Sequence, residues 1–493
     1  MAIWAMLKTQ WNYWRGRRAE TEDLERIIRY MRQRRARGLD PLPFGVANRL
    51  RARRRKRRNP AQVRALQARL VRNTVAYVYR YVPFYRQALD AAGVEPADIR
   101  SLADVPKLPI TRREQLAERG QEFISRYPGL VPSTLVGSGG TTGRPLILYM
   151  ATEELQYYVA NRAMGMLTSG WIGPSDILQM HQSLDGSAMG LITATAARMA
   201  GALVITMGRM GTLDDHLKSI FEERHVPGKK PKVSGLITSP SHLWGLTHRA
   251  QEKGLDLHDS GVRWIITGGA TVSEDLKKRV LERWGVRLSE NYGLNEVMTA
   301  GGTPCHESDR LHFSDTGGYA EVLDPETEEP VPPGEPGVLV ITTFYPNRLL
   351  TPLLRYWTED LVILSPDPVC VCGAVTTQIL DVVGRADYMV TVGANNYYPQ
   401  TIGDPLTVLP ELVQPPRFTL RTEMGEDAQH AVLDVELEAS LSEEEQQQLR
   451  KRIEQSIVLS RHWEVKAGSI KLRVNLCPAG SIERPFPYKH RAS

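Results

Sequence analysis

Gly137-Ser-Gly-Gly-Thr-Thr-Gly143 is the stretch from which the fold of this chain can be worked out. Its small residues let the backbone approach an anion closely, and the hydroxyls of Ser138, Thr141 and Thr142 can donate to phosphate oxygens. The stretch predicts a phosphate-binding loop; the alternative is a flexible loop without a ligand. It is not a Walker A loop, since no Gly-Lys-Ser/Thr follows, nor a dinucleotide fingerprint, since Thr142 replaces the third glycine.

Apolar, β-rich segments alternate with helical segments around this loop. Strands are expected at residues 134–136, 146–148, 202–205, 235–237 and 264–266, and helices at residues 155–167 and 273–284. Such alternation predicts α/β sheets with helices packed on them. Further along the chain, Tyr319–Leu323 and Val338–Ile341 flank a Pro/Gly-rich turn and predict two antiparallel strands.

The chain continues on both sides of this α/β region. Helical apolar spacing from Pro60 onward predicts a long amphipathic helix that is interrupted at Pro83. Near the other end, Ser442 and Glu445 form a capping box that predicts a helix between strands at 431–437 and 469–474. These C-terminal elements predict a small α+β unit.

A chain of 493 residues is longer than one hydrophobic core usually supports. We expect a basic N-terminal extension at residues 1–60, a large α/β domain at 61–386 and a smaller mobile α+β lid domain at 387–493. No run of 18 apolar residues occurs, and the apolar N-terminal stretch ends at Lys8, so we expect a cytoplasmic protein without a membrane span. The oligomeric state is open, and a homodimer is one option.

The net charge of +6 is unevenly distributed along the chain. Residues 1–60 hold 18 Lys+Arg against 5 Asp+Glu, so the remainder is net acidic. The run from Arg51 to Arg58 could bind phosphate backbone or an anionic membrane, but a solvated face or arm is the simpler interpretation. No RNA-binding aromatic motif or zinc-finger spacing accompanies the run, so nucleic acid is not an expected partner.

Six blocks of sequence follow one another between residues 72 and 387. They are Arg72–Arg86, which contains Val-Pro-Phe-Tyr, the loop at 137–143, Gly268-Gly-Ala270, Asn291-Tyr-Gly-Leu-Asn-Glu296, Arg355-Tyr-Trp-Thr-Glu-Asp360 and Gly384-Arg-Ala-Asp387. Together they resemble the adenylate-forming superfamily, and within it the phenylacetate-CoA ligase-like family. Asn295 departs from the family, which carries a hydroxyl residue at this position.

The resemblance implies that the large domain is an ATP-binding adenylation domain. In that family a carboxylic acid reacts with ATP to give an acyl-adenylate and pyrophosphate, and the acyl group then passes to CoA. The residues implied in ATP binding are Ser138, Gly139, Gly140, Thr141, Thr142, Gly143, Gly268, Gly269, Ala270, Asn291, Tyr292, Asp360 and Arg385.

The side chains in these blocks suit ATP chemistry. Tyr292 offers an aromatic face on which adenine can stack, and Asp360 can accept hydrogen bonds from ribose hydroxyls. Glu296 is expected to be catalytic as an oxygen ligand of Mg²⁺, which usually takes one or two carboxylates plus substrate phosphates. Each residue has a structural alternative: core packing for Tyr292, a helix first turn for Glu296 and a solvated turn for Asp360.

A cation at the α-phosphate would stabilise the charge that develops during adenylation. The superfamily supplies a lysine from the C-terminal domain, and Lys489 is the nearest match in this chain. Its surroundings depart from the family's Gly-Lys pattern, so a frayed tail without function is the alternative. We expect the lid to rotate about Asp387, placing Lys489 over the phosphates in one position and exposing the intermediate in another.

Three of the four cysteines lie close together in the sequence. Cys370 and Cys372 form a Cys-x-Cys pair, and Cys305 lies upstream with His306 or His312, which predicts a Cys₃His zinc site. The family carries a Leu-His at the position of His312, which favours His312 over His306. We expect this zinc to be structural; buried cysteines with unrelated histidines are the alternative.

Two departures from the family concern the substrate. The family's post-hinge Arg-Gly-x-Asn has no arginine here, which leaves open whether the acceptor is CoA. His181, Gln182 and Asp185 make the expected acyl pocket polar, so we expect an aromatic or short acyl acid with hydroxyl or amino substituents. The alternative is that these three residues are loop residues outside the pocket.

Three functions are therefore compared. The first is an ATP-dependent ligase that joins such an acid to CoA. The second uses the same fold and ATP for a non-thiol acceptor, as in amine ligation, or for nitrite-dependent diazotisation of an aromatic amine in specialised metabolism. The third is an inactive relative that acts as a basic interaction module, against which the complete set of ATP residues argues.

Overall fold

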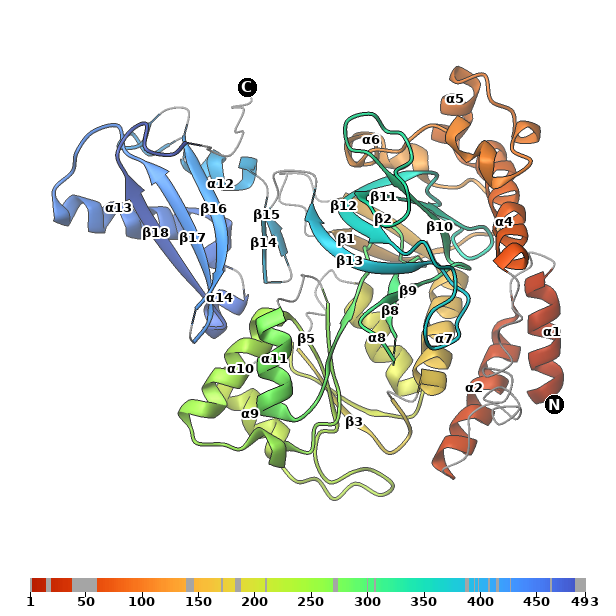
Figure 1. Cartoon of the computed structure of the whole chain (residues 1–493), viewed down its shortest axis with the longest axis horizontal. Coiled ribbons are helices and arrows are strands. Elements are labelled where there is room, and N and C mark those ends of the chain that lie inside the picture. Colours follow the sequence, from red (N-terminus) through yellow and green to blue (C-terminus); the bar gives the residue numbers. More distant parts are fainter. Residues whose placement is uncertain are drawn as a thin grey trace.

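The structure of the protein is a computed structural model. It describes residues 2–14, 19–37, 60–138, 146–169, 172–181, 188–208, 211–268, 274–298, 300–305, 307–385, 390–393, 395–397, 399–406, 408–413, 416–425, 427–461 and 463–483. The described residues form an α/β fold, as the sequence predicts (Figure 1).

A five-stranded parallel sheet lies in one half of the large domain. Its strands are β3 (Ile177–Met180), β4 (Leu203–Thr206), β5 (Gly235–Thr238), β6 (Ile265–Gly268) and β7 (Leu288–Asn291). The helices of this region are α7 (Thr152–Ser169), α8 (Ala188–Met199), α9 (Leu213–Phe221), α10 (Pro240–Glu252) and α11 (Glu274–Trp284), with the 3₁₀ turn η4 (Leu257–Ser260). The expected strands at β4, β5 and β6 and the expected helices at α7 and α11 are confirmed within a few residues.

The strand order of this sheet is β4-β3-β5-β6-β7, with parallel neighbours throughout. The chain moves outward from β3 to β4 and then returns past β3 to β5, so the direction of sheet growth reverses between β3 and β5. In open parallel sheets, ligands bind at the carboxyl ends of strands where the order reverses in this way.

The second half of the large domain is antiparallel. A six-stranded sheet has the order β10-β11-β12-β13-β9-β8, and β1 and β2 form a separate hairpin. The bounds are β1 (Pro132–Ser138), β2 (Leu146–Ala151), β8 (Gly302–Pro304), β9 (Leu311–Phe313), β10 (Gly318–Leu323), β11 (Pro336–Thr343), β12 (Tyr356–Leu364) and β13 (Gln378–Arg385). The expected hairpin of β10 and β11 is confirmed.

Helices cover the N-terminal side of the molecule. They are α1 (Ala2–Trp14), α2 (Thr21–Ala36), α4 (Pro60–Tyr81), α5 (Pro83–Ala91) and α6 (Arg113–Glu118), with the 3₁₀ turns η1 (Pro96–Asp98), η2 (Leu102–Lys107) and η3 (Gly120–Phe123). The predicted break at Pro83 separates α4 from α5, because a proline at the first helical position suits a new helix.

The basic N-terminal extension contains the helices α1 and α2, which were not predicted from its highly charged sequence. The apolar face of α2 is buried, including Leu24, Ile27 and Met31. Arg35 Nε, near the end of α2, donates to the Leu167 carbonyl of α7 at 3.1 Å. This helix is therefore packed on the large domain, whereas the run from Arg51 to Arg58 lies outside the described residues.

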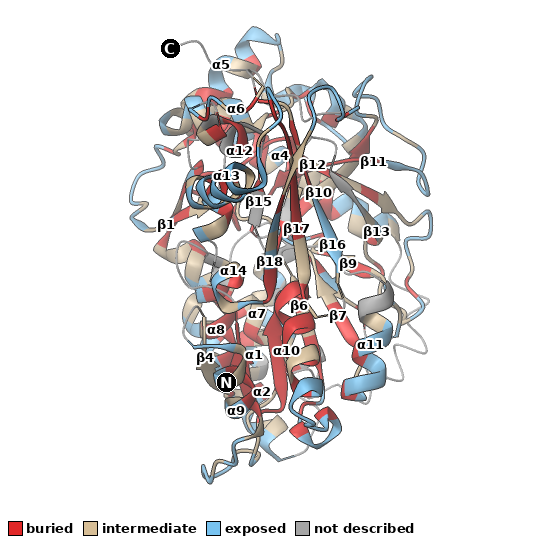
Figure 2. Cartoon of the chain, turned by 90° about the vertical axis from the view of Figure 1, so that its left-hand side faces the viewer, coloured by how far each residue is buried: buried red, intermediate tan, exposed pale blue. Residues whose placement is uncertain are grey.

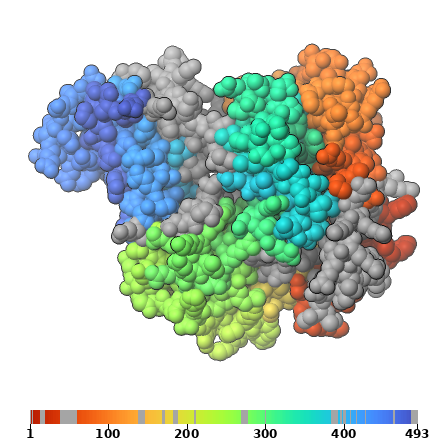
Figure 3. All heavy atoms as spheres, viewed as in Figure 1, coloured from red at the N-terminus to blue at the C-terminus, as the bar shows by residue number. Residues whose placement is uncertain are grey.

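The C-terminal residues form a unit with its own hydrophobic core, which includes Phe418, Leu433 and Ile453. Its elements are β14 (Val390–Val392), β15 (Asn395–Tyr397), α12 (Pro399–Leu406), β16 (Phe418–Met424), β17 (Gln429–Glu436), α13 (Glu443–Ser456), η5 (Val458–Arg461), α14 (Trp463–Ala467) and β18 (Ile470–Cys477). The C-terminal unit and the N-terminal helices lie at opposite ends of the molecule (Figure 3).

The C-terminal unit contacts the large domain at the start of α10. The buried carboxylate of Glu464 in α14 accepts hydrogen bonds from the hydroxyls of Ser239 and Ser241. Ser469 Oγ lies 2.9 Å from Nδ1 of His242. Figure 2 shows β17 and β18 above the largely buried helix α10, and both strands begin at the end that lies next to this helix.

None of the described helices combines the length and the apolar character that are needed to cross a lipid bilayer.

A buried carboxylate connects the hairpin of β1 and β2 to the rest of the large domain. Glu154, in the first turn of α7, is fully buried and accepts hydrogen bonds from the backbone N–H groups of Ala151, Leu349 and Leu350. The buried Arg348 guanidinium lies 3.6 Å from its Oε1. One carboxylate thus joins segments that lie almost 200 residues apart in the sequence.

Replacing this carboxylate is expected to destabilise the large domain. Glu154→Ala would leave a buried guanidinium without its counter-charge, which typically costs about 3–5 kcal/mol in the free energy of unfolding. Chemical denaturation of the variant should show the loss. Glu118→Ala, at an exposed position of α6, should change the unfolding free energy by less than about 0.5 kcal/mol. Equal midpoints for the two variants would contradict the role of Glu154.

Candidate active site

The predicted phosphate loop connects the two strands of a hairpin. Ser138 at the end of β1 pairs with Leu146 at the start of β2. The strand expected after the loop is therefore confirmed, and it distinguishes this loop from a loop that opens a helix. Gly139 to Gly143 and the side chain of Ser138 lie outside the described residues.

The second predicted block lies beside this loop. Asn295 Nδ2 donates to the carbonyl oxygen of Gly137 at 3.2 Å. Asn291, the last residue of β7, pairs with Gly268 at the end of β6, so two predicted blocks are neighbours in the parallel sheet. Gly269 and Ala270 are outside the described residues. Asn295, which departs from the family, thus contacts the edge of the predicted phosphate loop.

Tyr292 and Asp360 are in direct contact. The Tyr292 hydroxyl donates to Asp360 Oδ2 at 2.7 Å, and Asp360 is only 6% exposed. On the neighbouring strand, Arg385 is the register partner of Asp360, although its side chain is not described. Three residues predicted to bind the nucleotide, from positions 292 to 385, therefore meet at the edge between the two sheets.

Glu296 has a partner that the sequence did not reveal. Arg113 Nη1 in α6 donates to Glu296 Oε1 at 2.9 Å, and both side chains are largely buried. Arg113 belongs to none of the six blocks, and neither charge pattern nor spacing links it to a residue 183 positions away. A metal ion at Glu296 would therefore bind beside a guanidinium.

Several predicted residues are not placed by the structure. Lys489, Asp387, Gln182 and Asp185 lie outside the described residues, so their roles remain predictions. His181 directly follows β3 and is 1% exposed, with its Nε2 at 2.9 Å from Nε2 of Gln179. A role of His181 in the acyl pocket also remains a prediction.

The predicted zinc ligands come together. Cys305, His312, Cys370 and Cys372 offer four ligand atoms within 4.8 Å of one another. Cys305 Sγ lies 3.7 Å from Cys370 Sγ, and Cys372 Sγ lies 3.6 Å from His312 Nε2. A tetrahedral zinc with Zn–S bonds of about 2.3 Å needs sulfurs about 3.8 Å apart, so these residues fit a zinc ion.

The thiols of this cluster differ in acidity. Burial raises the pKa of Cys305, but hydrogen bonds from Ser308 and the Glu307 N–H outweigh it and hold the pKa below its ordinary value. Burial and the neighbouring thiols raise the pKa of Cys372 to about 12. A bound cation would lower the pKa of every thiol in the cluster, because a coordinating thiol is deprotonated.

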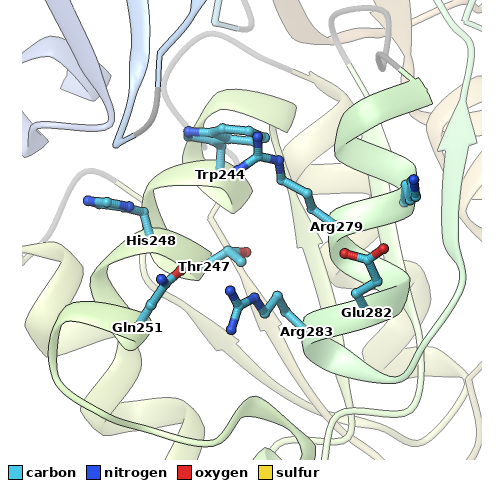
Figure 4. A pocket seen from close by; sticks show the side chains of 8 residues that line it. Trp244, Thr247, His248, Gln251, Arg279, Glu282 and Arg283 are labelled. Carbon is cyan, nitrogen blue, oxygen red and sulfur yellow. The ribbon is translucent and has the colours of Figure 1, made fainter.

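A cavity of about 270 Å³ lies elsewhere, between α10 and α11 (Figure 4). It is lined by Trp244, Thr247, His248, Gln251, Lys278, Arg279, Glu282 and Arg283. The Arg279 guanidinium lies 4.6 Å from the centre of the Trp244 ring. None of the residues predicted for ATP or zinc lines this cavity, so it is not part of the candidate active site.

Known proteins support the interpretation of this geometry. The family model of AMP-binding enzymes matches residues 131–344. A phenylacetate-coenzyme A ligase from Thermus thermophilus is 29% identical over 364 residues, which cover 73% of this chain and 79% of that protein. Another from Escherichia coli is 27% identical over 410 residues, covering 81% and 90% of the two chains.

Solved structures show the same fold. A crystal structure of 2-hydroxyisobutyryl-CoA ligase with 2-HIB-AMP and CoA, in the thioesterification state, superposes with a TM-score of 0.73 at 20% identity. The match covers 88% of this chain and 90% of that one. The same ligase in the postadenylation state gives a TM-score of 0.59 over a similar share.

The fold, the adjoining ATP blocks and the relatives define an ATP-dependent adenylate-forming ligase. Within that class, the chain is similar to phenylacetate-coenzyme A ligases at 27–29% identity over most of its length, which supports the resemblance that the six blocks predicted.

The hydrogen bond between Tyr292 and Asp360 can be tested directly. Tyr292→Phe removes a donor to a buried carboxylate, so we expect ATP to bind about tenfold more weakly in a calorimetric titration. Tyr79→Phe is a matched control, because Tyr79 donates to Asp90 at 2.9 Å on the surface and should leave ATP affinity unchanged. Unchanged affinity in Tyr292→Phe would separate this bond from nucleotide binding.

Proposed function

We propose that this ligase activates a carboxylic acid with ATP and transfers the acyl group to CoA. In the first step a carboxylate oxygen attacks the α-phosphorus of ATP, and pyrophosphate leaves. In the second step the CoA sulfur attacks the acyl carbonyl carbon, AMP leaves, and the thiol proton passes to solvent. The observation that carries the proposal is the meeting of Tyr292, Asp360 and the Asn295–Gly137 contact beside the phosphate loop.

The roles of the nucleotide residues follow from their chemistry. The Asp360 carboxylate would accept from ribose hydroxyls, and its bond to Tyr292 would hold both side chains in place. The Tyr292 ring would lie against adenine. Mg²⁺ would neutralise charge on the phosphates when bound, and Glu296 is the carboxylate that would hold it. Lys489 would supply the cation at the α-phosphate.

The acid is proposed to be aromatic with a polar substituent. His181 directly follows β3 at the carboxyl end of the parallel sheet, where ligands of such sheets bind, and Gln182 and Asp185 come next in the sequence. Buried polar groups in the acyl pocket would be left without partners by a purely apolar acid, which discriminates against it.

One observation favours a second candidate, in which the acceptor is not a thiol. Where the family's Arg-Gly-x-Asn carries arginine, this chain carries Val392, the last residue of β14. Val392 is fully buried in the core of the C-terminal unit, so an apolar side chain replaces the cation of the family. The assay below therefore also tests amine ligation and nitrite-dependent diazotisation of an aromatic amine. The relatives that are phenylacetate-coenzyme A ligases support CoA as the acceptor.

Pyrophosphate release tests the two candidates together. The full chain is assayed with ATP and Mg²⁺ against a panel of aryl acids, amino-substituted aryl acids and nitrite, each with and without CoA. The proposal expects release that requires an acid, rises with CoA and is accompanied by an acyl-CoA product. Pyrophosphate release that depends on nitrite or an amine and does not change with CoA would contradict CoA as the acceptor. Absence of pyrophosphate release with every substrate would contradict the proposed ligase activity.

The role of Glu296 can be separated from its ion pair with Arg113. If Glu296 binds Mg²⁺, Glu296→Gln should lower kcat by about 10²–10³ and raise the Mg²⁺ concentration needed for half-maximal rate. Arg113→Ala removes a competing cation and should lower that Mg²⁺ concentration. Glu114→Gln, at an exposed position of the same helix, is the control. An unchanged Mg²⁺ dependence in Glu296→Gln would restrict Glu296 to the ion pair.

We also propose a structural zinc at Cys305, His312, Cys370 and Cys372. Cys372→Ser should lower the zinc content by one ion per chain and lower the thermal midpoint, because zinc binding stabilises only the folded state. Cys477→Ser, in the C-terminal unit, should retain the zinc content of the unmodified protein. Elemental analysis of untagged protein measures both. Zinc content that is equal in the two variants would overturn this site.

A further inference from the structure

Three histidines form a second buried cluster, away from the thiols. His181, His216 and His242 are each 1% exposed or less, and their ring centres lie 4.7–4.9 Å apart. Each offers a ring nitrogen within 4.8 Å of the other two. His216 Nδ1 lies 2.8 Å from His242 Nε2. Only His181 was singled out from the sequence, because the other two lie in helices with ordinary apolar patterns.

The cluster lies at the point where the order of the parallel sheet reverses. His181 follows β3 directly, and His242 is in the first turn of α10, which follows β5. His216 comes from α9, the helix that connects β4 to β5. The carboxyl ends of β3 and β5 are neighbours in the sheet, and ligands bind to such folds at this place.

Two buried atoms beside the cluster lack hydrogen-bond partners among the described residues. They are His181 Nδ1 and Gln179 Oε1. Gln179 Nε2 is directed toward His181 Nε2 at 2.9 Å and donates to the His216 carbonyl at 3.1 Å. A buried polar atom without a partner destabilises the folded protein, so two such atoms in neighbouring side chains need an explanation.

With one bound ion and one rotation of the Gln179 amide, both atoms would gain partners, while Gln179 Nε2 would give up its hydrogen bond to the His216 carbonyl. If the Gln179 amide turns by 180°, Oε1 accepts from His181 Nε2–H, and His181 Nδ1 then presents a lone pair. The His216 carbonyl lies inside α9 and keeps its helical hydrogen bond. A cation bound by His181 Nδ1, His216 Nδ1 and His242 Nε2 would use the lone pairs of all three rings.

The charge state of the cluster suits this arrangement. Burial holds the pKa of His181 well below its ordinary value, and the neighbouring imidazoles lower it further. Burial and His216 act in the same direction on His242. Both effects favour the neutral form of His181 and His242, which is the form that binds metals.

We propose that His181, His216 and His242 bind a divalent transition metal ion, for which Zn²⁺ is the natural candidate. Three neutral imidazoles are a known ligand set for zinc, with a fourth position left for water. Ser469 Oγ, 2.9 Å from His242 Nδ1, would accept the proton of that nitrogen and fix the tautomer that directs Nε2 at the metal.

The ion would connect the two parts of the molecule. Ser469 belongs to the C-terminal unit, whereas the three ligands belong to the large domain. Docking of the C-terminal unit would thus complete the surroundings of the metal without contributing a ligand. His181 is also one of the residues proposed for the acyl pocket, so metal content, and not activity, is the measurement that tests this site.

Metal counting on the untagged full chain tests the proposal. Protein stripped by a chelator is reloaded with Co²⁺, desalted and analysed for bound metal, and its visible spectrum is recorded. We expect Cys372→Ser to retain one ion per chain with d–d absorption and no thiolate charge-transfer band. The double variant Cys372→Ser/His181→Ala should retain none. The matched control is Cys372→Ser/His248→Ala, because His248 lies on α10 outside the cluster and should leave the ion in place.

The change in thermal midpoint on adding Zn²⁺ tests the site separately, because it compares the same folded variant with and without the ion. Zn²⁺ added to stripped Cys372→Ser protein should raise its thermal midpoint, because an ion that binds only the folded state stabilises it. The same addition to the His181→Asn version should have no effect. Absence of bound Co²⁺ in Cys372→Ser, or equal metal content with and without His181, would overturn the proposal and leave a hydrogen-bonded histidine network.

Discussion

The contact between Tyr292 and Asp360 is the constraint that brings the two halves of the large domain into one site. Tyr292 follows β7 of the parallel sheet, and its backbone exchanges hydrogen bonds with Gly302 of the antiparallel sheet at 3.0 and 2.9 Å. Its hydroxyl then reaches Asp360 in β12. The backbone and the side chain of one residue thus fix the edge where the residues predicted to bind the nucleotide converge.

Much of this arrangement could be predicted from the sequence, because the chemistry lies in contiguous blocks. The loop at 137–143 and the Asn291–Glu296 and Arg355–Asp360 blocks carry their own residue types in a recognisable order. The apolar runs likewise predicted the parallel strands β4, β5 and β6, but not β3 or β7. Strands in the middle of such sheets are buried on both faces and therefore read as apolar runs. The Cys₃His cluster was predictable because three of four cysteines lie near one another in the sequence.

The contacts that could not be predicted join residues that lie far apart in the sequence. Arg113 meets Glu296 only because α6 packs near the end of β7, and no local pattern records that contact. The histidine cluster is similar, since its members come from one strand end and two helices. In α2, the high charge hid an apolar face at helical spacing, so the helix was overlooked although its signal is present.

The contact between the C-terminal unit and α10 depends on a buried negative charge. Glu464 is fully buried, and its carboxylate lies at the amino end of a helix, where two serine hydroxyls and the positive pole of the helix stabilise a negative charge. Undocking must exchange these fixed dipoles for water around the same carboxylate. If the C-terminal unit moves as the mobile lid that the sequence predicts, the hydration of this one anion would have to replace those dipoles, and dissolved anions that compete for the helix end would favour the undocked arrangement.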